Sequence, residues 1–418
     1  MVPAIAGLIY GPLVHRFAPE ARGHGVPEVM YAVAMRGGRI APKVALVKSF
    51  ASALCIGGGG SVGREGPIVQ IGSSVGSALA QWLRLDTPRV RLLVACGAAG
   101  GISATFNAPL AGPFFAMELI LRDFAAQSFG AVVLSSVTAS IVGRAVLGED
   151  SFLSLPAFSV HNPVEYLLYA VLGVIVGIVG VAFTKVLYVV EDVCDWVWRG
   201  PEWARPAVGG LALGALLLAL PEMYGVGYPV LQNAIQGRYV IVFLVLLMLA
   251  KMLATSLTIG IGGSGGVFAP TLFVGAMAGS AFGAVVHPWW PSATEAAGAY
   301  GLVGMGAALA RGHSGVDHRG DHAFRTHRSI HDHPAADGRG RPGGWHQPPA
   351  EQADYLHPEV VETRRRHRAR PRAWRHGDGC RHRVRTGGAS EGGHAALCRG
   401  GSVGSGIDGH AASRQRRQ

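Results

Sequence analysis

The stretch GGGGSVGREGPIVQIG, residues 57–72, places one arginine and one glutamate in a segment that is otherwise almost entirely glycine and apolar. Consecutive glycines favour irregular backbone, whereas Pro67 suits the first turn of a helix, because the N–H that proline lacks has no partner there. The pattern predicts an irregular lead-in followed by a helix that begins near Glu65. The beginning of a helix presents unpaired N–H groups and the positive end of its dipole, and both favour an anion.

A second copy of this pattern lies 203 residues further along the chain. GSVGREGPIVQIGSSVGSA (60–78) and GSGGVFAPTLFVGAMAGSA (263–281) agree at eight of nineteen positions, and the match resumes between CGAAGG (96–101) and MGAALA (305–310). Such self-similarity indicates a duplication. We expect the two lead-ins to meet inside the membrane, as they do in inverted-repeat transporters. The G-x-x-x-G spacings of Gly72 with Gly76 and of Gly275 with Gly279 predict close helix packing. Two ordinary packing helices are the alternative, which explains these spacings but not the irregular lead-ins.

The composition is that of a membrane protein. Hydrophobic residues make up 49% of the chain, charged residues 15%, and the mean hydropathy is +0.30, whereas soluble domains carry about a quarter charged residues. Residues 166–190 and 239–259 are long enough to cross a bilayer. The other apolar stretches are shorter or broken by glycine and proline, which favours a transporter; they are 3–14, 90–121, 128–147, 207–220, 267–287 and 298–310. We therefore expect an all-α, polytopic membrane protein.

The last part of the chain is chemically different. Residues 311–418 hold 20 arginines, no lysine and 13 of the 17 histidines, without an apolar period, so we expect this tail to be disordered. An arginine cluster at 362–376 raises the alternative of a nucleic-acid or anionic-lipid patch. A third interpretation is translation in the wrong frame of a GC-rich gene, since the repeat predicts an Ala-Pro-Leu helix after Ala310 that is missing. We favour the third interpretation and expect no nucleic-acid partner.

Four motifs resemble the CLC family of chloride channels and proton-coupled chloride antiporters: GHGVPEV (23–29), GREGPIVQIG (63–72), FNAPLAG (106–112) and GGVFAP (265–270). The resemblance covers residues 1–310 and implies a CLC-type transmembrane anion-transport domain with an inverted-repeat fold of broken and tilted helices. It implies a homodimer with one pore per subunit, chloride as the transported ion, no cofactor, and a prokaryotic plasma membrane as the location. By the same resemblance the domain is incomplete at both ends and lacks the last helix, which carries the pore tyrosine.

The resemblance also implies which residues form the pathway. Glu65 matches the gating glutamate, whose ionised carboxylate occupies an anion site and withdraws once protonated; the alternative is a first-turn glutamate that merely suits the helix dipole. The supporting positions are Pro67 and Pro270, which begin the two duplicated helices. The implied anion contacts are His24, Gly25 and Val26 on the inner side, with the backbone amides around Arg64, Glu65, Gly66, Val267 and Phe268.

Four further positions qualify this expectation. Lys48 matches a buried lysine that raises the pore potential, and snorkelling at a helix end is the alternative. Glu118 is functional by default inside a membrane, although a packing anchor explains it better. His24 replaces the usual inner-site serine, as an anion donor or a structural histidine. Leu119 stands where antiporters of the family carry their internal proton-transfer glutamate.

The sequence therefore predicts chloride transport through a pore gated by Glu65, with a passive channel favoured because Leu119 cannot relay a proton. A proton-coupled antiporter with another proton route and an inactive truncated product are the alternatives, and a membrane-anchored protein with a nucleic-acid-binding tail is the third. We expect no enzyme, since no Ser-His-Asp, H-E-x-x-H or Walker pattern stands in a suitable context. Pro67 and His24 together do not suggest the fluoride-exporting branch. The five cysteines form no C-x-x-C pair, so neither a disulfide framework nor a metal site follows.

Overall fold

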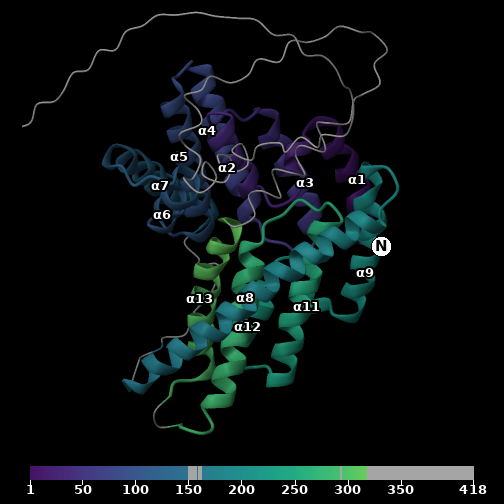
Figure 1. Ribbon diagram of the computed structural model, residues 1–418, viewed down its shortest axis with the longest axis vertical. Coiled ribbons are helices and arrows are strands. Elements are labelled where there is room, and N and C mark those ends of the chain that lie inside the picture. Colours follow the sequence, from purple (N-terminus) through teal and green to yellow (C-terminus); the bar gives the residue numbers. More distant parts are fainter. Residues whose placement is uncertain (149–157, 159–161, 292–293, 318–418) are drawn as a thin grey trace, which may run out of the picture. The chain divides into compact units, whose positions relative to one another are not determined.

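The computed structural model describes residues 1–148, 158, 162–291 and 294–317, all within the first of two units, Met1–Trp345. Its long regular elements over these residues are helices (Figure 1). A π-helical turn (Ala116–Leu121) follows α6, and short 3-10 turns lie at Pro19–Ala21, Glu202–Ala204 and Pro221–Met223. The helices are α1 (Val2–Phe17), α2 (Val26–Met35), α3 (Lys43–Gly57), α4 (Glu65–Trp82), α5 (Thr87–Phe106), α6 (Ala111–Phe115), α7 (Ala126–Leu147), α8 (Val164–Val197), α9 (Arg205–Ala219), α10 (Tyr228–Ile235), α11 (Ile241–Gly260), α12 (Phe268–Val286) and α13 (Ala297–Asp317).

Among the described residues, four helices are long and apolar enough to cross a membrane: α7, α8, α11 and α12. Two of them confirm the expected spans at 166–190 and 239–259. The other two correct the expectation that residues 128–147 and 267–287 are short or broken, because each forms a continuous helix. The physical reason is that a glycine costs a helix only about 1 kcal/mol, whereas an unpaired backbone group in lipid costs several.

The expected break within residues 90–121 is confirmed. Helix α5 ends at Phe106, and Asn107 adopts the left-handed conformation with a φ of 53°. Helix α6 starts four residues later, at Ala111. The chain therefore changes direction within the FNAPLAG motif.

The duplication relates α1–α5, in the first half of the chain, to α9–α13, in the second half. Helix α4 packs against α2, α3 and α5, and α12 packs in the same way against α10, α11 and α13, while α1 packs against α9 (Figure 1). The predicted G-x-x-x-G contacts are present in both halves. A Cβ on Gly72 would lie 2.9 Å from the carbonyl carbon of Gly97 in α5, and a Cβ on Gly275 would lie 3.0 Å from that of Gly304 in α13. The small residues therefore allow each helix pair to pack backbone against backbone.

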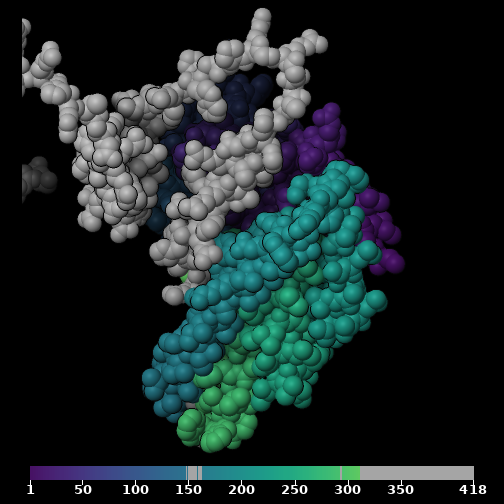
Figure 2. Space-filling view, turned by 45° about the vertical axis from the view of Figure 1, so that its right-hand side comes forward, coloured from purple at the N-terminus to yellow at the C-terminus, as the bar shows by residue number. Residues whose placement is uncertain are grey.

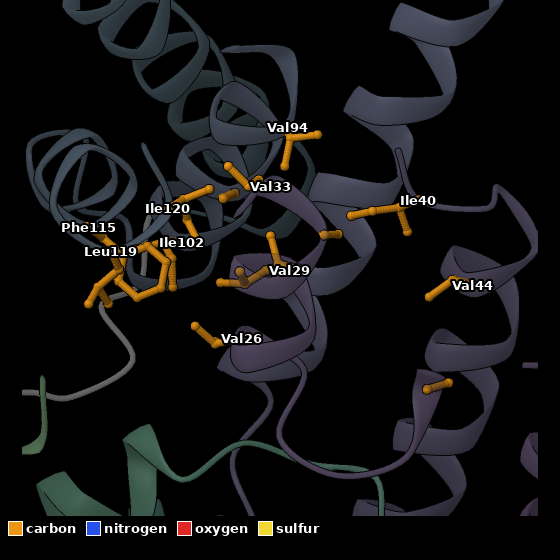
Figure 3. Packing of buried hydrophobic residues seen from close by; sticks show 14 of the residues in the cluster. Val26, Val29, Val33, Ile40, Val44, Val94, Ile102, Phe115, Leu119 and Ile120 are labelled. Carbon is orange, nitrogen blue, oxygen red and sulfur yellow. The ribbon is translucent and has the colours of Figure 1, made fainter. Parts of the chain in front are cut away.

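The apolar core of the first half surrounds α2. Val29 and Val33 on α2 are buried, and Ile102 of α5 and Phe115 of α6 lie near them in the same cluster (Figure 3). Leu119, from the π-helical turn, belongs to the same cluster and is 7% exposed. Val26, the first residue of α2, belongs to this cluster as well.

The outer face of the second half carries exposed apolar side chains. Helix α8 is 34 residues long and packs along α11, α12 and α13 (Figure 2). Its outward residues Leu167, Val174 and Ile178 are each about two-thirds exposed. Exposed aliphatic side chains along a membrane-length helix suit contact with lipid.

The predicted boundary at Ala310 falls inside a helix, because α13 continues to Asp317. The rest of the predicted tail, 318–418, and with it the arginine cluster at 362–376, lies outside the described residues. Cys55, Cys96 and Cys194 are free thiols, and Cys55 is buried. No group of three metal-ligating side chains was found in the described part of the chain.

Candidate functional site

The two duplicated lead-ins meet, as the sequence analysis predicts. The N–H of Gly63 donates to the carbonyl oxygen of Gly266, and the N–H of Gly266 donates to that of Gly63, each at 2.7 Å. Both glycines are buried. The reciprocal pair therefore brings the N-terminal ends of α4 and α12 together inside the protein.

A third irregular segment joins this pair. The N–H of Gly23 donates to the carbonyl oxygen of Gly263 at 3.2 Å, and the N–H of Gly265 donates to that of Gly23 at 3.3 Å. The start of α2 therefore lies beside the starts of α4 and α12. Gly66 lies where these segments approach closely, since a Cβ there would lie 3.0 Å from the Cα of Gly266 and 3.3 Å from the carbonyl carbon of His24.

Lys48 holds the segment that precedes α2. Its side chain is fully buried in α3, and Nζ donates to the carbonyl oxygens of Ala21 at 3.0 Å and Gly23 at 2.8 Å. A buried ammonium with two backbone partners is not snorkelling, so that alternative is wrong. The positive charge of Lys48 therefore lies beside the backbone that immediately precedes His24.

Lys251 is the counterpart of Lys48 in the second half and was missed by the sequence analysis. Its Nζ donates to the Ser61 hydroxyl and to the carbonyl oxygen of Gly225, each at 2.9 Å, and its side chain is fully buried in α11. It therefore holds the segment that precedes α10. The signal was present, because Lys251 follows Lys48 by 203 residues, which is the offset of the repeat.

Glu65 is the first residue of α4, and its side chain is fully buried. Its Oε1 accepts a hydrogen bond from the hydroxyl of Tyr228 at 2.9 Å. The backbone N–H groups of Glu65 and Ala269 attract its negative charge, and so does the ammonium group of Lys251. Its Oε2 makes no hydrogen bond to the residues that the structure describes. The carboxylate thus lies at the beginnings of two helices, where a negative charge is favoured.

A cavity of about 110 Å³, called the inner cavity below, opens beside the starts of α2 and α12. The Nδ1 atom of His24 is buried near it without a hydrogen-bond partner in the described part of the chain. Such an atom is free to donate to an anion in one tautomer. The residues lining the cavity include His24, Val26, Pro27, Leu119, Val267, Phe268 and Thr271.

The remaining predicted positions separate into buried and exposed ones. Pro67 and Pro270 are buried in the first turns of α4 and α12. The side chain of Arg64 is exposed, and its guanidinium carbon lies 5.6 Å from the centroid of the Tyr228 ring. The expected role of Glu118 as a packing anchor stays a prediction, and its side chain is exposed on this chain. The cause is its place on the π-helical turn, where its neighbours Met117 and Leu119 point into the core instead.

Taken together, the site combines helix beginnings, buried ammonium groups and irregular backbone around one carboxylate. The first N–H groups of a helix have no partner within that helix. Two such ends, with Lys48 and Lys251 nearby, create a positive potential inside the protein. This arrangement suits a desolvated anion.

The chain matches the family profile described as voltage gated chloride channel over residues 6–312. A ClcB-like chloride channel protein of Ralstonia nicotianae is 35% identical over 314 residues, which are 74% of this chain and 73% of that protein. The H(+)/Cl(-) exchange transporter ClcA of Vibrio parahaemolyticus is 36% identical over 320 residues, covering 74% of this chain and 68% of that transporter.

Solved structures share the fold. A slow cyanobacterial Cl-/H+ antiporter superposes with a TM-score of 0.67 at 23% identity, over 80% of this chain and 87% of the antiporter. A CLC-type fluoride/proton antiporter superposes with a TM-score of 0.62 at 26% identity, over 75% and 76% of the two chains. The proteins of this family are membrane transporters, so the expectation that the chain is not an enzyme is confirmed. The chain therefore belongs to the CLC family of voltage gated chloride channels and proton–chloride exchangers, and it is a multi-pass membrane protein of that family.

Proposed function

We propose that this chain moves chloride or a similar anion across the membrane and that Glu65 is its gate. The observation that carries the proposal is the reciprocal pairing of Gly63 and Gly266, which brings two helix beginnings together around the buried Glu65 carboxylate. An anion that has lost its water needs donors that are already in place. Helix N–H groups supply such donors without requiring a positively charged side chain in the path.

The proposed gate works by competition between two negative charges. When Glu65 is ionised, its carboxylate occupies the position that an anion would take, and repulsion keeps a second anion out. Protonation removes that charge and weakens the attraction of the helix ends for the side chain. The side chain then withdraws and an anion takes its place. On the inner side, the anion passes His24 and the amides of Val267 and Phe268.

We favour passive conduction over coupled exchange because of Leu119. Leu119 is buried and lines the inner cavity together with His24, and a leucine side chain carries no proton. Coupled exchange through another route is the second candidate, and it is supported by relatives that are named as H(+)/Cl(-) exchange transporters. A homodimer is the assembly implied by the family resemblance, and light scattering of the detergent-solubilised protein tests it, with a monomer mass as the contradicting result.

The test is chloride efflux from proteoliposomes that contain the full 418-residue chain. We expect efflux above that of protein-free vesicles, increasing as the pH falls, since protonation opens the gate. In Glu65→Gln, which keeps the size of the side chain and removes its charge, we expect high efflux that no longer depends on pH. Glu118→Gln is the matched control, because Glu118 is exposed, and it retains the wild-type pH profile.

Recording external pH during the same efflux separates the two candidates. In an exchanger, chloride efflux drives protons into the vesicles, so the external pH rises. A passive channel lets chloride leave without this coupled proton uptake. Efflux equal to that of empty vesicles in both the wild type and Glu65→Gln would contradict anion transport. Equal pH profiles of these two proteins would contradict the role of Glu65.

A further inference from the structure

The Glu65 side chain accepts a hydrogen bond from the other half of the molecule. The Tyr228 hydroxyl, on the first residue of α10, donates to Oε1 of Glu65 at 2.9 Å although 163 residues separate the two. Hydrogen bonds to an ionised acceptor are about twice as strong as neutral ones. This bond therefore holds the carboxylate in its buried position more firmly when it is ionised than when it is protonated.

The repeat shows what Tyr228 replaces. The segments GHGVP (23–27) and GVGYP (225–229) are related by an offset of 202, and Gly25 and Gly227 share a φ of 90°. Each segment therefore places a glycine with positive φ immediately before a short helix. Tyr228 corresponds to Val26 in the first half.

The partner of Tyr228 is also duplicated. At an offset of 203, Glu65 corresponds to Phe268, so the pair formed by Tyr228 and Glu65 corresponds to Val26 and Phe268. Val26 and Phe268 both line the inner cavity and are apolar. The corresponding positions of the repeat are thus apolar in one half and joined by a hydrogen bond in the other. Because Val26 satisfies the packing at the corresponding position without a hydroxyl, packing alone does not account for the hydroxyl of Tyr228.

Neighbouring groups hold Tyr228 in place. Lys251 donates to the carbonyl oxygen of Gly225 and so fixes the segment immediately before α10. The guanidinium of Arg64 lies 5.6 Å from the centroid of the Tyr228 ring, within the range of a cation–π contact. The backbone before Tyr228 and the Tyr228 ring are thus each held by a neighbouring cation, which favours a fixed direction of the hydroxyl towards Glu65.

We propose that Tyr228 is a positioning residue for Glu65, whose hydroxyl holds the ionised carboxylate in the pathway and thereby sets how readily the gate opens. This inference rests on the proposed role of Glu65 as the gate. It gives a part in gating to Tyr228, a residue of the second half that lies outside both duplicated lead-ins. Tyr228 does not itself carry the proton or the anion.

The test compares Tyr228→Phe with the wild type in chloride efflux at a series of pH values, using the full chain in proteoliposomes. Losing a hydrogen bond to a charged group changes an equilibrium by about tenfold or more. We therefore expect about tenfold higher efflux near neutral pH and a pH profile moved by about one unit towards higher pH. The matched control is Tyr224→Phe, which removes a hydroxyl that donates to the carbonyl oxygen of Gly57 instead, and it keeps the wild-type profile.

A second background shows whether Tyr228 acts through Glu65. In Glu65→Gln, adding Tyr228→Phe should change efflux by less than about twofold, because the ionised acceptor is already gone. An equal increase in both backgrounds would overturn the proposal, and so would a Tyr228→Phe profile that coincides with that of Tyr224→Phe. Tyr228→Val introduces the residue that the first half carries at the corresponding position, and it must give the same shift because it also lacks the hydroxyl. This second variant keeps the proposal testable if Tyr228→Phe folds poorly. Failure of the gate proposal looks different, since Glu65→Gln alone would then keep the wild-type pH profile.

Discussion

Replacing Gly266 by alanine should separate the two helix beginnings on which the proposed anion site depends. A Cβ at this position would lie 2.7 Å from the backbone nitrogen of Gly66 and 3.1 Å from its Cα. Ordinary van der Waals contacts of a Cβ begin near 3.4 Å, and both atoms belong to a helix start that cannot turn away as a side chain can. The two segments must therefore move apart by several tenths of an ångström.

The cost follows from this movement. Forcing an extra methyl group into a packed interior costs about 1–3 kcal/mol. The separation also strains the two hydrogen bonds between Gly63 and Gly266, each 2.7 Å long, and a buried backbone hydrogen bond contributes about 0.5–1.5 kcal/mol. We therefore expect Gly266→Ala to lower the free energy of unfolding by about 2–6 kcal/mol. Chloride efflux should fall with it, because the amides of α4 and α12 no longer converge.

Thermal unfolding in detergent and efflux from proteoliposomes measure the two effects. Gly57→Ala is the matched control, since it lies in the glycine-rich stretch of the first lead-in and an added Cβ there meets no atom within 4 Å. It should be neutral or stabilising by about 0.5–1 kcal/mol, because alanine is the better helix former. If Gly266→Ala melts and conducts like Gly57→Ala, the two helix starts do not support one another and the reasoning fails.

Three other changes test the site and the repeat. Lys251→Met leaves the carbonyl oxygen of Gly225 without its buried donor, so we expect a loss of about 1–3 kcal/mol in thermal unfolding; an unchanged melting temperature would show that this lysine does not hold the segment before α10. Gly72→Leu should separate α4 from α5, where a Cβ already meets the backbone of Gly97, and Gly173→Leu, where an added Cβ has open space, is the control; equal melting of the two variants would refute the close packing. Leu119→Glu places a carboxyl group beside the inner cavity; we expect the expressed variant to show proton movement coupled to chloride, and chloride efflux without any pH change would argue against a proton route at this position.

Several parts of the architecture were predictable from local patterns. The spacing of glycine and proline around Pro67 and Pro270 predicted two irregular lead-ins before helices, and both are present. A break within residues 90–121 was also expected, and it lies at Asn107. These predictions succeed because proline and glycine act on the backbone locally, whatever surrounds them. Residues 128–147 show the limit of the same reasoning, since the environment outweighed the cost of glycine and kept α7 continuous.

The sequence by itself determined that the chain is a duplicated, all-helical membrane protein and that Glu65 stands at a helix beginning. Only the tertiary structure decided what that glutamate contacts. The donor is Tyr228, 163 residues away. Neither its distance along the sequence nor its residue type predicts that it contacts Glu65. The physical reason is that a helix start is specified by its own few residues, whereas a buried hydrogen bond between two halves depends on how they pack. The same holds for Glu118, whose exposure follows from the π-helical turn that carries it.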